Sequence, residues 1–355
     1  MLSFLFKFAT NKHTHIFMKI QAFYFLSILL ITILVSSSCS NEVDINDDYK
    51  EISIVYGLLD QSESRHFVKL TKAFQTEGNV YLAAADQANS QYDPNDVEMW
   101  LEEYSINGGY IKSIPMDTVL ITKKDSGAFY FPNQLVYATA EGIILNQNRE
   151  YKLKAKIKSS GNQIEAETKI IDDFHIDKPI SLVKYADFSG NYSHTVQFFS
   201  PEKGKLYQLV IRFYYTEIPT SGPKTSHFTD WKLSQIRSKT TDGGQKLTYE
   251  FLGSTFYNNL ASTIEPAENG LKRWSDSVQY IISVADEDLT IYMDVNSPST
   301  SIVQDKPAYS NIENGYGIFA SRYQKIRPFI GLSPKSLDTL INGSVTYQLG
   351  FENRP

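Results

Sequence analysis

The sequence predicts a mainly β protein: an N-terminal immunoglobulin-like β-sandwich followed by a second β-rich domain with a few short helices. Apolar and polar residues alternate with period two along most of the chain, which is the pattern of half-buried strands. The 23 tyrosines and 21 phenylalanines favour strands over helices. Clusters of Gly, Asn, Ser and Asp separate the alternating runs and predict the turns between antiparallel strands.

The predicted sandwich occupies residues 50–171. Its first strands are predicted at residues 52–59, 66–70, 97–104 and 110–114. The clearest hairpin joins residues 151–158 to residues 164–170, and its first strand has lysines on one face and apolar residues on the other. Lysines opposite glutamates would support this pairing on the outer face. One buried face and one wet face are typical of a sandwich rather than a parallel sheet.

The second domain is predicted at residues 172–355, where Asp172 and Asp173 interrupt the alternation. Its strands are predicted at residues 180–185, 195–199, 207–215, 247–251, 278–284 and 344–351. Its two helices are predicted at residues 254–264, with Ser254 as N-cap, and at residues 286–295, with Asp286 as N-cap. Residues 219–244 are rich in Ser, Thr, Gly and Pro and predict a long loop.

The N-terminal residues predict a secreted lipoprotein. Met18 and Lys19 precede an apolar run over residues 20–35, three serines and then Cys39. Such an order is that of a secretory signal, and its end resembles the lipobox of bacterial lipoproteins, whose cysteine carries a diacylglyceryl group. We therefore expect cleavage after Ser38 and a lipid on Cys39 whose acyl chains include palmitate. An uncleaved anchor helix is the alternative, although the apolar run is shorter than the ~20 residues that span a membrane.

The residues around this signal complete the predicted N-terminal organisation. Residues 1–38 are interpreted as an over-extended start plus the signal peptide, with Met18 as the true initiator. Residues 39–49 form a predicted acidic tether, which resembles the surface-export signal of Bacteroidota lipoproteins; a plain solvated linker is the other interpretation. Cys39 is the only cysteine, so we expect no disulfide and no thiolate metal site.

The charge balance limits the expected partners. The formal net charge is −6, and residues 1–38 contribute three lysines and no acid, so the chain beyond them is more acidic still. Nucleic acid and anionic membrane surfaces demand a basic patch. We therefore expect no nucleic-acid partner, and we expect membrane contact through the lipid anchor.

The sequence contains no catalytic motif that we can identify, so we predict that the chain is not an enzyme and needs no cofactor or metal. The histidines beyond the signal have no partner at metal-binding spacing: His66, His175, His194 and His227. Among the aromatic residues, Trp100 lies in an alternating strand and is expected in the core. Trp231 lies in the predicted long loop and is a candidate ligand contact, because flat rings stack on apolar ligand faces.

Two segments carry a resemblance to a known family. Residues 56–60 (YGLLD) are followed by residues 66–74 (HFVKLTKAF), and residues 309–320 (YSNIENGYGIFA) come near the far end. These resemble the opening and closing motifs of a Bacteroidota outer-membrane lipoprotein family catalogued as a domain of unknown function. The resemblance implies an envelope lipoprotein, often found beside TonB-dependent transporters, and brings no catalytic residues. Within the closing motif, Asn314-Gly315 and Gly317 are expected at turns that need positive φ.

The predicted function is that of a non-enzymatic lipoprotein, anchored in the outer membrane, that binds a ligand or docks on a TonB-dependent transporter. Exposure at the cell surface follows if the tether is an export signal. Two alternatives stay open. One is a secreted glycan or peptide hydrolase whose site assembles only in the fold, for example from two acids among residues 286–294. The other is a structural or adhesive surface protein.

Overall fold

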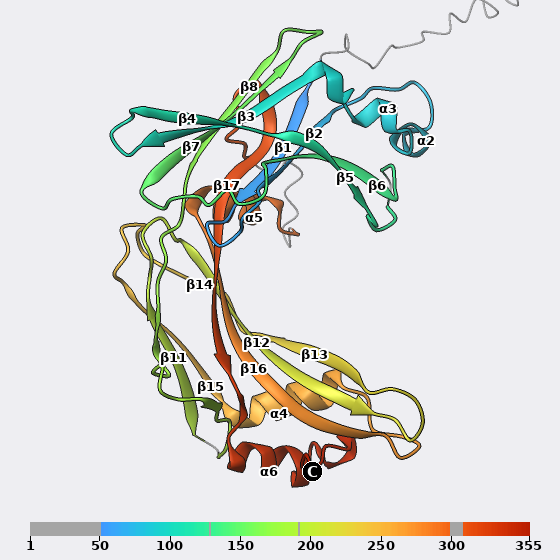
Figure 1. Ribbon diagram of the computed structural model, residues 1–355, viewed down its shortest axis with the longest axis vertical. Coiled ribbons are helices and arrows are strands. Elements are labelled where there is room, and N and C mark those ends of the chain that lie inside the picture. The colour runs from blue at the N-terminus through green and yellow to red at the C-terminus, as the bar shows by residue number, and fades with distance from the viewer. Residues whose placement is uncertain (1–50, 128, 191, 299–307) are drawn as a thin grey trace, which may run out of the picture. The chain divides into compact units, whose positions relative to one another are not determined.

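A computed structural model describes residues 51–127, 129–190, 192–298 and 308–355 (Figure 1). Lys50–Pro355 forms one compact unit. The chain is mainly β, as predicted, with several sheets and a few short helices. The predicted signal peptide, Cys39 and the acidic tether lie outside the described residues.

The first part of the chain folds as an immunoglobulin-like sandwich. One of its sheets has the order β1-β2-β6-β5 and the other the order β4-β3-β7-β8. These are the orders A-B-E-D and C′-C-F-G of an immunoglobulin-like fold. The strands are β1 (Ser53–Leu59), β2 (Phe67–Lys72), β3 (Val97–Ser105), β4 (Tyr110–Pro115), β5 (Asp117–Thr122), β6 (Asn133–Ala138), β7 (Arg149–Ile157) and β8 (Gln163–Lys169). Between β2 and β3 lie α2 (Val80–Ala84), α3 (Gln87–Ser90) and the 3₁₀ turn η1 (Pro94–Asp96).

The two sheets bury a mostly aliphatic core between their inner faces. Val55 and Leu59 of β1 face Leu101 of β3 and Leu153 of β7 across this core, and all four are fully buried. The outer face of the β7–β8 hairpin has the predicted charge pairs, because Lys152 pairs with Glu167 at 2.9 Å and Lys154 pairs with Glu165.

The prediction for Trp100 was wrong. In β3 the buried register falls on Val97, Met99 and Leu101, so the intervening Trp100 lies on the outer face and is only half-buried. Its indole Nε1 donates a hydrogen bond to Glu102 Oε1 at 3.1 Å. The alternation itself was read correctly, but a large aromatic residue occupies the wet face.

One long strand, β17 (Gly315–Phe329), belongs to both parts of the described chain (Figure 1). Its first half pairs in parallel with β1, and its second half pairs antiparallel with β16 (Lys272–Ala285). Local sequence patterns do not predict this strand, because the glycines at its start are typical of turns between short strands. Asn314 (φ 55°) and Gly317 (φ 116°) have the expected positive φ, whereas Gly315 does not.

The second part of the chain packs two sheets and two helices around an aromatic core. The large sheet continues from β17 in the order β13-β12-β16-β17, and the small sheet has the order β15-β11-β9. Helices α4 and α6 add Phe256 and Leu340 to this core. The remaining bounds are β9 (Ile176–Lys178), β10 (Tyr185–Ala186), β11 (Ser193–Phe199), β12 (Leu206–Ile218), β13 (Thr225–Lys232), β14 (Ile236–Arg237), β15 (Lys246–Leu252), β18 (Gly331–Leu332), α4 (Gly253–Thr263), α5 (Glu287–Asn296), α6 (Pro334–Asn342) and η2 (Tyr347–Leu349).

Several local predictions for this part were wrong. The strand expected at residues 180–185 is reduced to β10, and the strand expected at residues 344–351 is replaced by η2 after α6. The long loop expected at residues 219–244 contains β13, which pairs with β12 along its whole length. The N-cap of α4 is Leu252 rather than Ser254, whereas the predicted N-cap Asp286 is confirmed, because its carboxylate accepts from Leu289 N at 2.8 Å.

The two buried clusters bear on the predicted domains. Ile170 belongs to the sandwich cluster and Ile171 to the aromatic cluster, so the clusters divide next to the predicted boundary. Ile312 and Phe319, however, come from the far end of the chain and belong to the sandwich cluster. Residues 172–355 therefore contribute to both cores, and independent folding of the two predicted domains stays a prediction.

Candidate functional site

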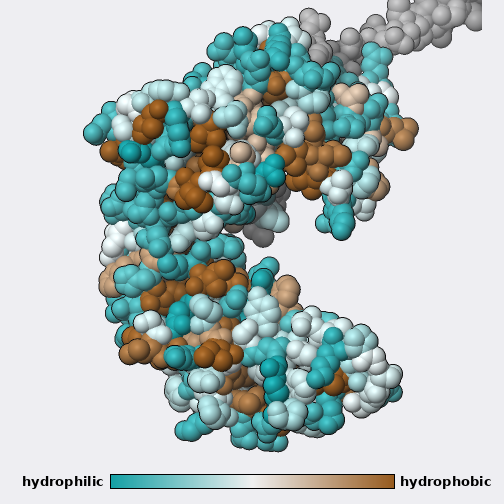
Figure 2. All heavy atoms as spheres, in the orientation of Figure 1, coloured by the Kyte–Doolittle hydropathy of each residue, from teal (hydrophilic) through white to brown (hydrophobic). Residues whose placement is uncertain are grey.

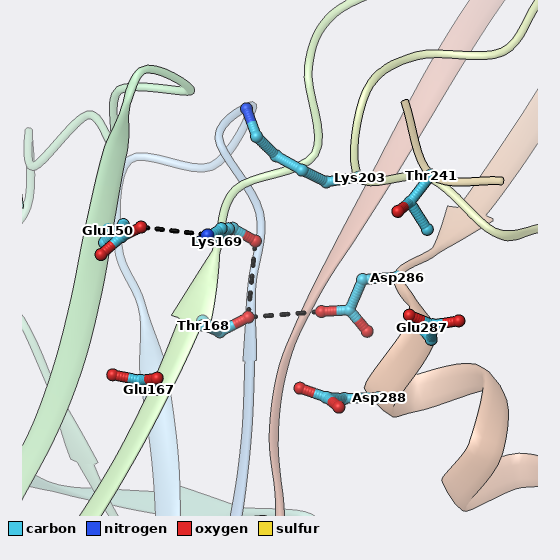
Figure 3. A pocket seen from close by; sticks show the side chains of 9 residues that line it. All are labelled: Glu150, Glu167, Thr168, Lys169, Lys203, Thr241, Asp286, Glu287 and Asp288. Carbon is cyan, nitrogen blue, oxygen red and sulfur yellow. Dashed lines mark hydrogen bonds and ion pairs between the residues drawn. The ribbon is translucent and has the colours of Figure 1, made fainter. Parts of the chain in front are cut away.

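An acidic pocket of about 310 Å³ lies where β8, the start of α5 and the connection after β11 meet (Figure 3). Five carboxylates and two lysines line it: Glu150, Glu167, Asp286, Glu287, Asp288, Lys169 and Lys203. Acids gather at the first turn of α5 because a helix N-terminus carries partial positive charge and unpaired N–H groups.

Asp286 is the most constrained of these acids. Its carboxylate accepts hydrogen bonds from Leu289 N at 2.8 Å, from Ser321 N at 2.6 Å and from Thr168 Oγ1 at 3.3 Å. Burial raises the pKa of Asp286 to about 7, against the two backbone N–H groups, which favour the charged form. The side chain thus ties α5 to β8 of the sandwich and to β17.

Most other charges in the acidic pocket have partners within the protein. Lys169 pairs with Glu150 at 3.1 Å, and Lys203 pairs with Asp172 at 2.6 Å (Figure 3 shows the first pair). Asp288 accepts hydrogen bonds from Tyr309 Oη at 2.5 Å and from Asn311 Nδ2 at 3.2 Å, and both donors lie just before β17. These ion pairs and hydrogen bonds account for the charged residues of the acidic pocket as links between neighbouring elements of the fold.

A second pocket, of about 360 Å³, lies on the outer face of β1 and β2; we call it the lysine pocket. The connection between β5 and β6 and the end of α3 complete its walls. Four aromatic rings line it: Tyr56, Phe74, Phe129 and Tyr130. Tyr56 reaches this pocket because buried and outward positions alternate along β1 and Tyr56 is at an outward one.

Three lysines also line this pocket: Lys69, Lys72 and Lys124. No carboxylate is among its lining residues within the described part of the chain. Lys124 Nζ donates to the carbonyl oxygen of Tyr130 at 2.8 Å, and Lys69 Nζ lies 5.9 Å from the centre of the Tyr56 ring. Burial lowers the pKa of Lys69, and the positive charge of Lys124 lowers it further.

Hydrophobic side chains gather beside the lysine pocket. Figure 2 shows them over the region where β5 and β6 lie in Figure 1. The large exposed ones in this stretch are Leu120, Ile121, Phe129 and Phe131. Exposed apolar surface next to a pocket is a common property of binding sites.

The sequence-predicted site residues are not brought together. Cys39 lies outside the described residues. Trp231 lies in β13 rather than in a loop, is half-buried, and packs with ring centroids 5.2 Å from Phe251 and 6.4 Å from Phe256. Its role as a ligand contact stays a prediction.

The four histidines lie in separate parts of the fold: His66 precedes β2, His175 precedes β9, His194 lies in β11 and His227 in β13. His66 is buried and its Nε2 lies 2.9 Å from the carbonyl oxygen of Ile143, and burial lowers its pKa. His194 packs against aromatic rings, and His227 lies 3.4 Å from Glu217. Over the described ranges, no group of three or more His, Cys, Asp or Glu side chains is placed to hold a metal ion. Among the helices in those ranges, none is long and apolar enough to cross a membrane.

The lysine pocket was not predicted from the sequence. Lys69 and Lys72 fall in the segment that resembles the family's opening motif, and the outward position of Lys69 was readable from the alternation of β2. Lys124 and Phe129, in contrast, come from a connection whose flanking strands were not predicted. Only the pairing of β2 with β6 and of β6 with β5 brings them to the same face.

No family model matches the chain, and no curated protein matches it significantly. Among solved structures, the chain is similar to the C-terminal globular domain of an oligosaccharyltransferase from Pyrococcus abyssi, at 11% identity and a TM-score of 0.22. The match covers 62% of this chain and 44% of that one.

Proposed function

We propose that the chain is a non-enzymatic lipoprotein of the cell envelope, and that it captures a small ligand in the lysine pocket. The observation that carries this proposal is the pocket itself: about 360 Å³ lined by aromatic rings with a few polar groups. Pockets that hold small molecules have volumes of roughly 300–1,000 Å³ and this kind of lining.

Binding of a neutral aromatic probe tests whether the pocket accepts ligands. We expect naphthalene-2-carboxamide to bind the detergent-solubilised full chain saturably, measured by its fluorescence. Thr71 lines the pocket on the outer face of β2, so Thr71→Phe should fill it and weaken binding by more than about tenfold. The control Thr118→Phe, at an exposed position of β5, should leave binding unchanged.

A result with equal affinities in these two variants would place the probe elsewhere. Absence of saturable binding by naphthalene-2-carboxamide and by the charged probe described below would contradict capture in this pocket. Correct folding of Thr71→Phe is checked by its circular dichroism spectrum. We expect the variant to fold, since aromatic residues are favourable in strands.

The envelope address rests on the sequence. Cys39 after its apolar run supports a lipid anchor in the outer membrane, and the two motif segments support docking on a TonB-dependent transporter. Metabolic labelling with palmitate should mark the chain and should fail for Cys39→Ala. Affinity capture from solubilised envelope should recover a transporter; repeated capture without one would contradict docking.

A hydrolase is the second candidate, and one observation favours it. Asp286, whose pKa is raised to about 7, shares the acidic pocket with the carboxyl of Asp288, and pairs of carboxyls serve in glycoside hydrolysis. Turnover of 4-nitrophenyl glycosides that disappears in Asp288→Asn would establish it. We expect no turnover, because both oxygens of Asp286 already accept structural hydrogen bonds.

A further inference from the structure

The lysines on the two outer faces of the sandwich differ in their ion pairing. On the face of β7 and β8, most lysines of the hairpin pair with a glutamate: Lys152 and Lys154 pair with glutamates of β8, and Lys169 pairs with Glu150. On the face of β1 and β2, Lys69 pairs with no carboxylate of the described residues.

Lys124 adds a second positive charge beside Lys69. Its ammonium group is held by the carbonyl oxygen of Tyr130, which satisfies a hydrogen bond without neutralising the charge. The charge of Lys124 also lowers the pKa of Lys69, so the two ammonium groups lie close enough to repel. A chain of net charge −6 has carboxylates to spare, yet none in the described ranges lines this pocket.

The remaining walls define the rest of the ligand. Tyr56, Phe129 and Tyr130 present rings that flat apolar bodies stack on. Phe129 is 55% exposed and Tyr56 40%, so a ligand would remove considerable apolar area from water. Two partly desolvated ammonium groups beside these rings gain most from a negative charge placed between them.

We propose that the lysine pocket binds a small anionic ligand, with a carboxylate or an equivalent oxyanion held between Lys69 and Lys124 and a flat apolar body against the rings. This assignment rests on the proposed capture function and names the ligand class for it. The anion stabilises the charged form of Lys69 by opposing its repulsion with Lys124. The rings account for affinity toward the body of the ligand, whichever oxyanion it carries.

Two probes of nearly identical shape separate the charge from the apolar body. Naphthalene-2-carboxylate and naphthalene-2-carboxamide are titrated into the full chain at low ionic strength by fluorescence. We expect the carboxylate to bind about tenfold or more tightly than the amide, because it alone carries the negative charge. Added salt should shrink this difference by screening.

Variants assign the difference to the pocket. Lys69→Gln and Lys124→Gln should each lower the affinity for the carboxylate by about threefold to tenfold and leave the affinity for the amide within about twofold. Lys69→Arg keeps the charge and should restore binding. Lys123→Gln, one residue away and outside the lining, is the matched control and should change neither affinity.

The outcomes distinguish the inference from the function it builds on. Equal affinities for the two probes, or equal effects of Lys123→Gln and Lys124→Gln on the carboxylate, would overturn the anionic ligand class while capture of apolar bodies stands. Failure of both probes to bind would remove the proposed function as well. Should Lys69→Gln not fold, Lys124→Gln and Lys69→Arg decide the question.

Discussion

The sandwich core is mostly aliphatic, with Leu101, Leu153 and Ile157 among its fully buried side chains, whereas the core of the second part is built from packed rings. Phe188 and Phe256 stack there with ring centroids only 3.9 Å apart. In the sandwich, two sheets face each other at a regular spacing that branched aliphatic residues fill. In the second part, sheets and helices leave less regular gaps, and large flat side chains fill them.

The two cores also meet the rest of the chain differently. The sandwich obtains Phe319 from β17, far away in sequence, and the same strand continues into the second core with Tyr323 and Phe329. The edge that β1 would otherwise expose is therefore covered in parallel by β17. A single strand couples an aliphatic core to an aromatic one, so damage at β17 should affect both.

Gly317→Ala should have the largest effect. A Cβ at Gly317 would lie 1.9 Å from the carbonyl oxygen of Val55, and the φ of 116° strains any other residue. We expect a loss of more than about 4 kcal/mol in the free energy of unfolding, measured by urea denaturation followed by circular dichroism. Gly244→Ala, with φ 74° and open space around its Cβ position, should lose only about 1 kcal/mol. Equal losses would show that the β1–β17 contact tolerates a side chain.

Truncation in each core should come next in size. Phe256→Ala should cost about 3–5 kcal/mol and Leu153→Ala about 2–5 kcal/mol, because each leaves a cavity among fully buried neighbours. Since β17 serves both cores, we expect both variants to shift one common transition in differential scanning calorimetry. Two separate transitions, each shifted by one variant alone, would instead support independent folding of residues 50–171 and 172–355.

Asp286 should make the junction of the two parts sensitive to pH. Burial raises its folded-state pKa from 3.8 to about 7, so its contribution to stability is full below pH 3.8 and is lost as the pH rises through 7. Relative to Asp286→Asn, the chain should lose about 3 kcal/mol between pH 4.5 and 7.5, measured by urea denaturation at each pH. Glu287→Gln, whose carboxylate is largely exposed, is the control and should keep the same pH dependence as the unaltered chain. A rise in the stability of the unaltered chain relative to Asp286→Asn over this pH range would contradict the raised pKa.

The outer charge pairs of the sandwich should have the smallest effect. Lys152 and Glu167 are 35% and 71% exposed, so solvent screens their attraction. A double-mutant cycle with Lys152→Gln and Glu167→Gln should give a coupling energy below about 1 kcal/mol, smaller still at high salt. A coupling of several kcal/mol would mean that this face contributes to stability as much as the cores do.

The two segments on which the family resemblance was argued pair with each other in the fold. Residues 56–60 and residues 309–320 lie far apart in sequence, yet Tyr56 is in register with Ile318 and Gly57 with Phe319. A Cβ at Gly57 would lie 2.8 Å from the Phe319 ring, so the glycine of the opening motif makes room for the phenylalanine of the closing motif. The two motif segments are thus the two sides of one parallel strand pair.

The sequence by itself determined the features that depend on neighbouring residues. Alternation predicted β1, β3, β7 and β8, and the acid-rich start of α5 predicted its cap at Asp286, because side-chain period and capping are local. Local patterns failed at β13, where a segment rich in polar turn-forming residues forms a strand that pairs with β12. They also failed at residues 344–351, where a segment predicted as a strand contains the 3₁₀ turn η2.

Only the tertiary structure decided which distant segments meet. The parallel pairing of β1 with β17, the burial of Asp286 beneath Thr168 and Ser321, and the gathering of Lys69 and Lys124 in one pocket all join residues far apart in the chain. Strand register between such segments is set by the packing of whole sheets, and neither propensity nor period carries that information.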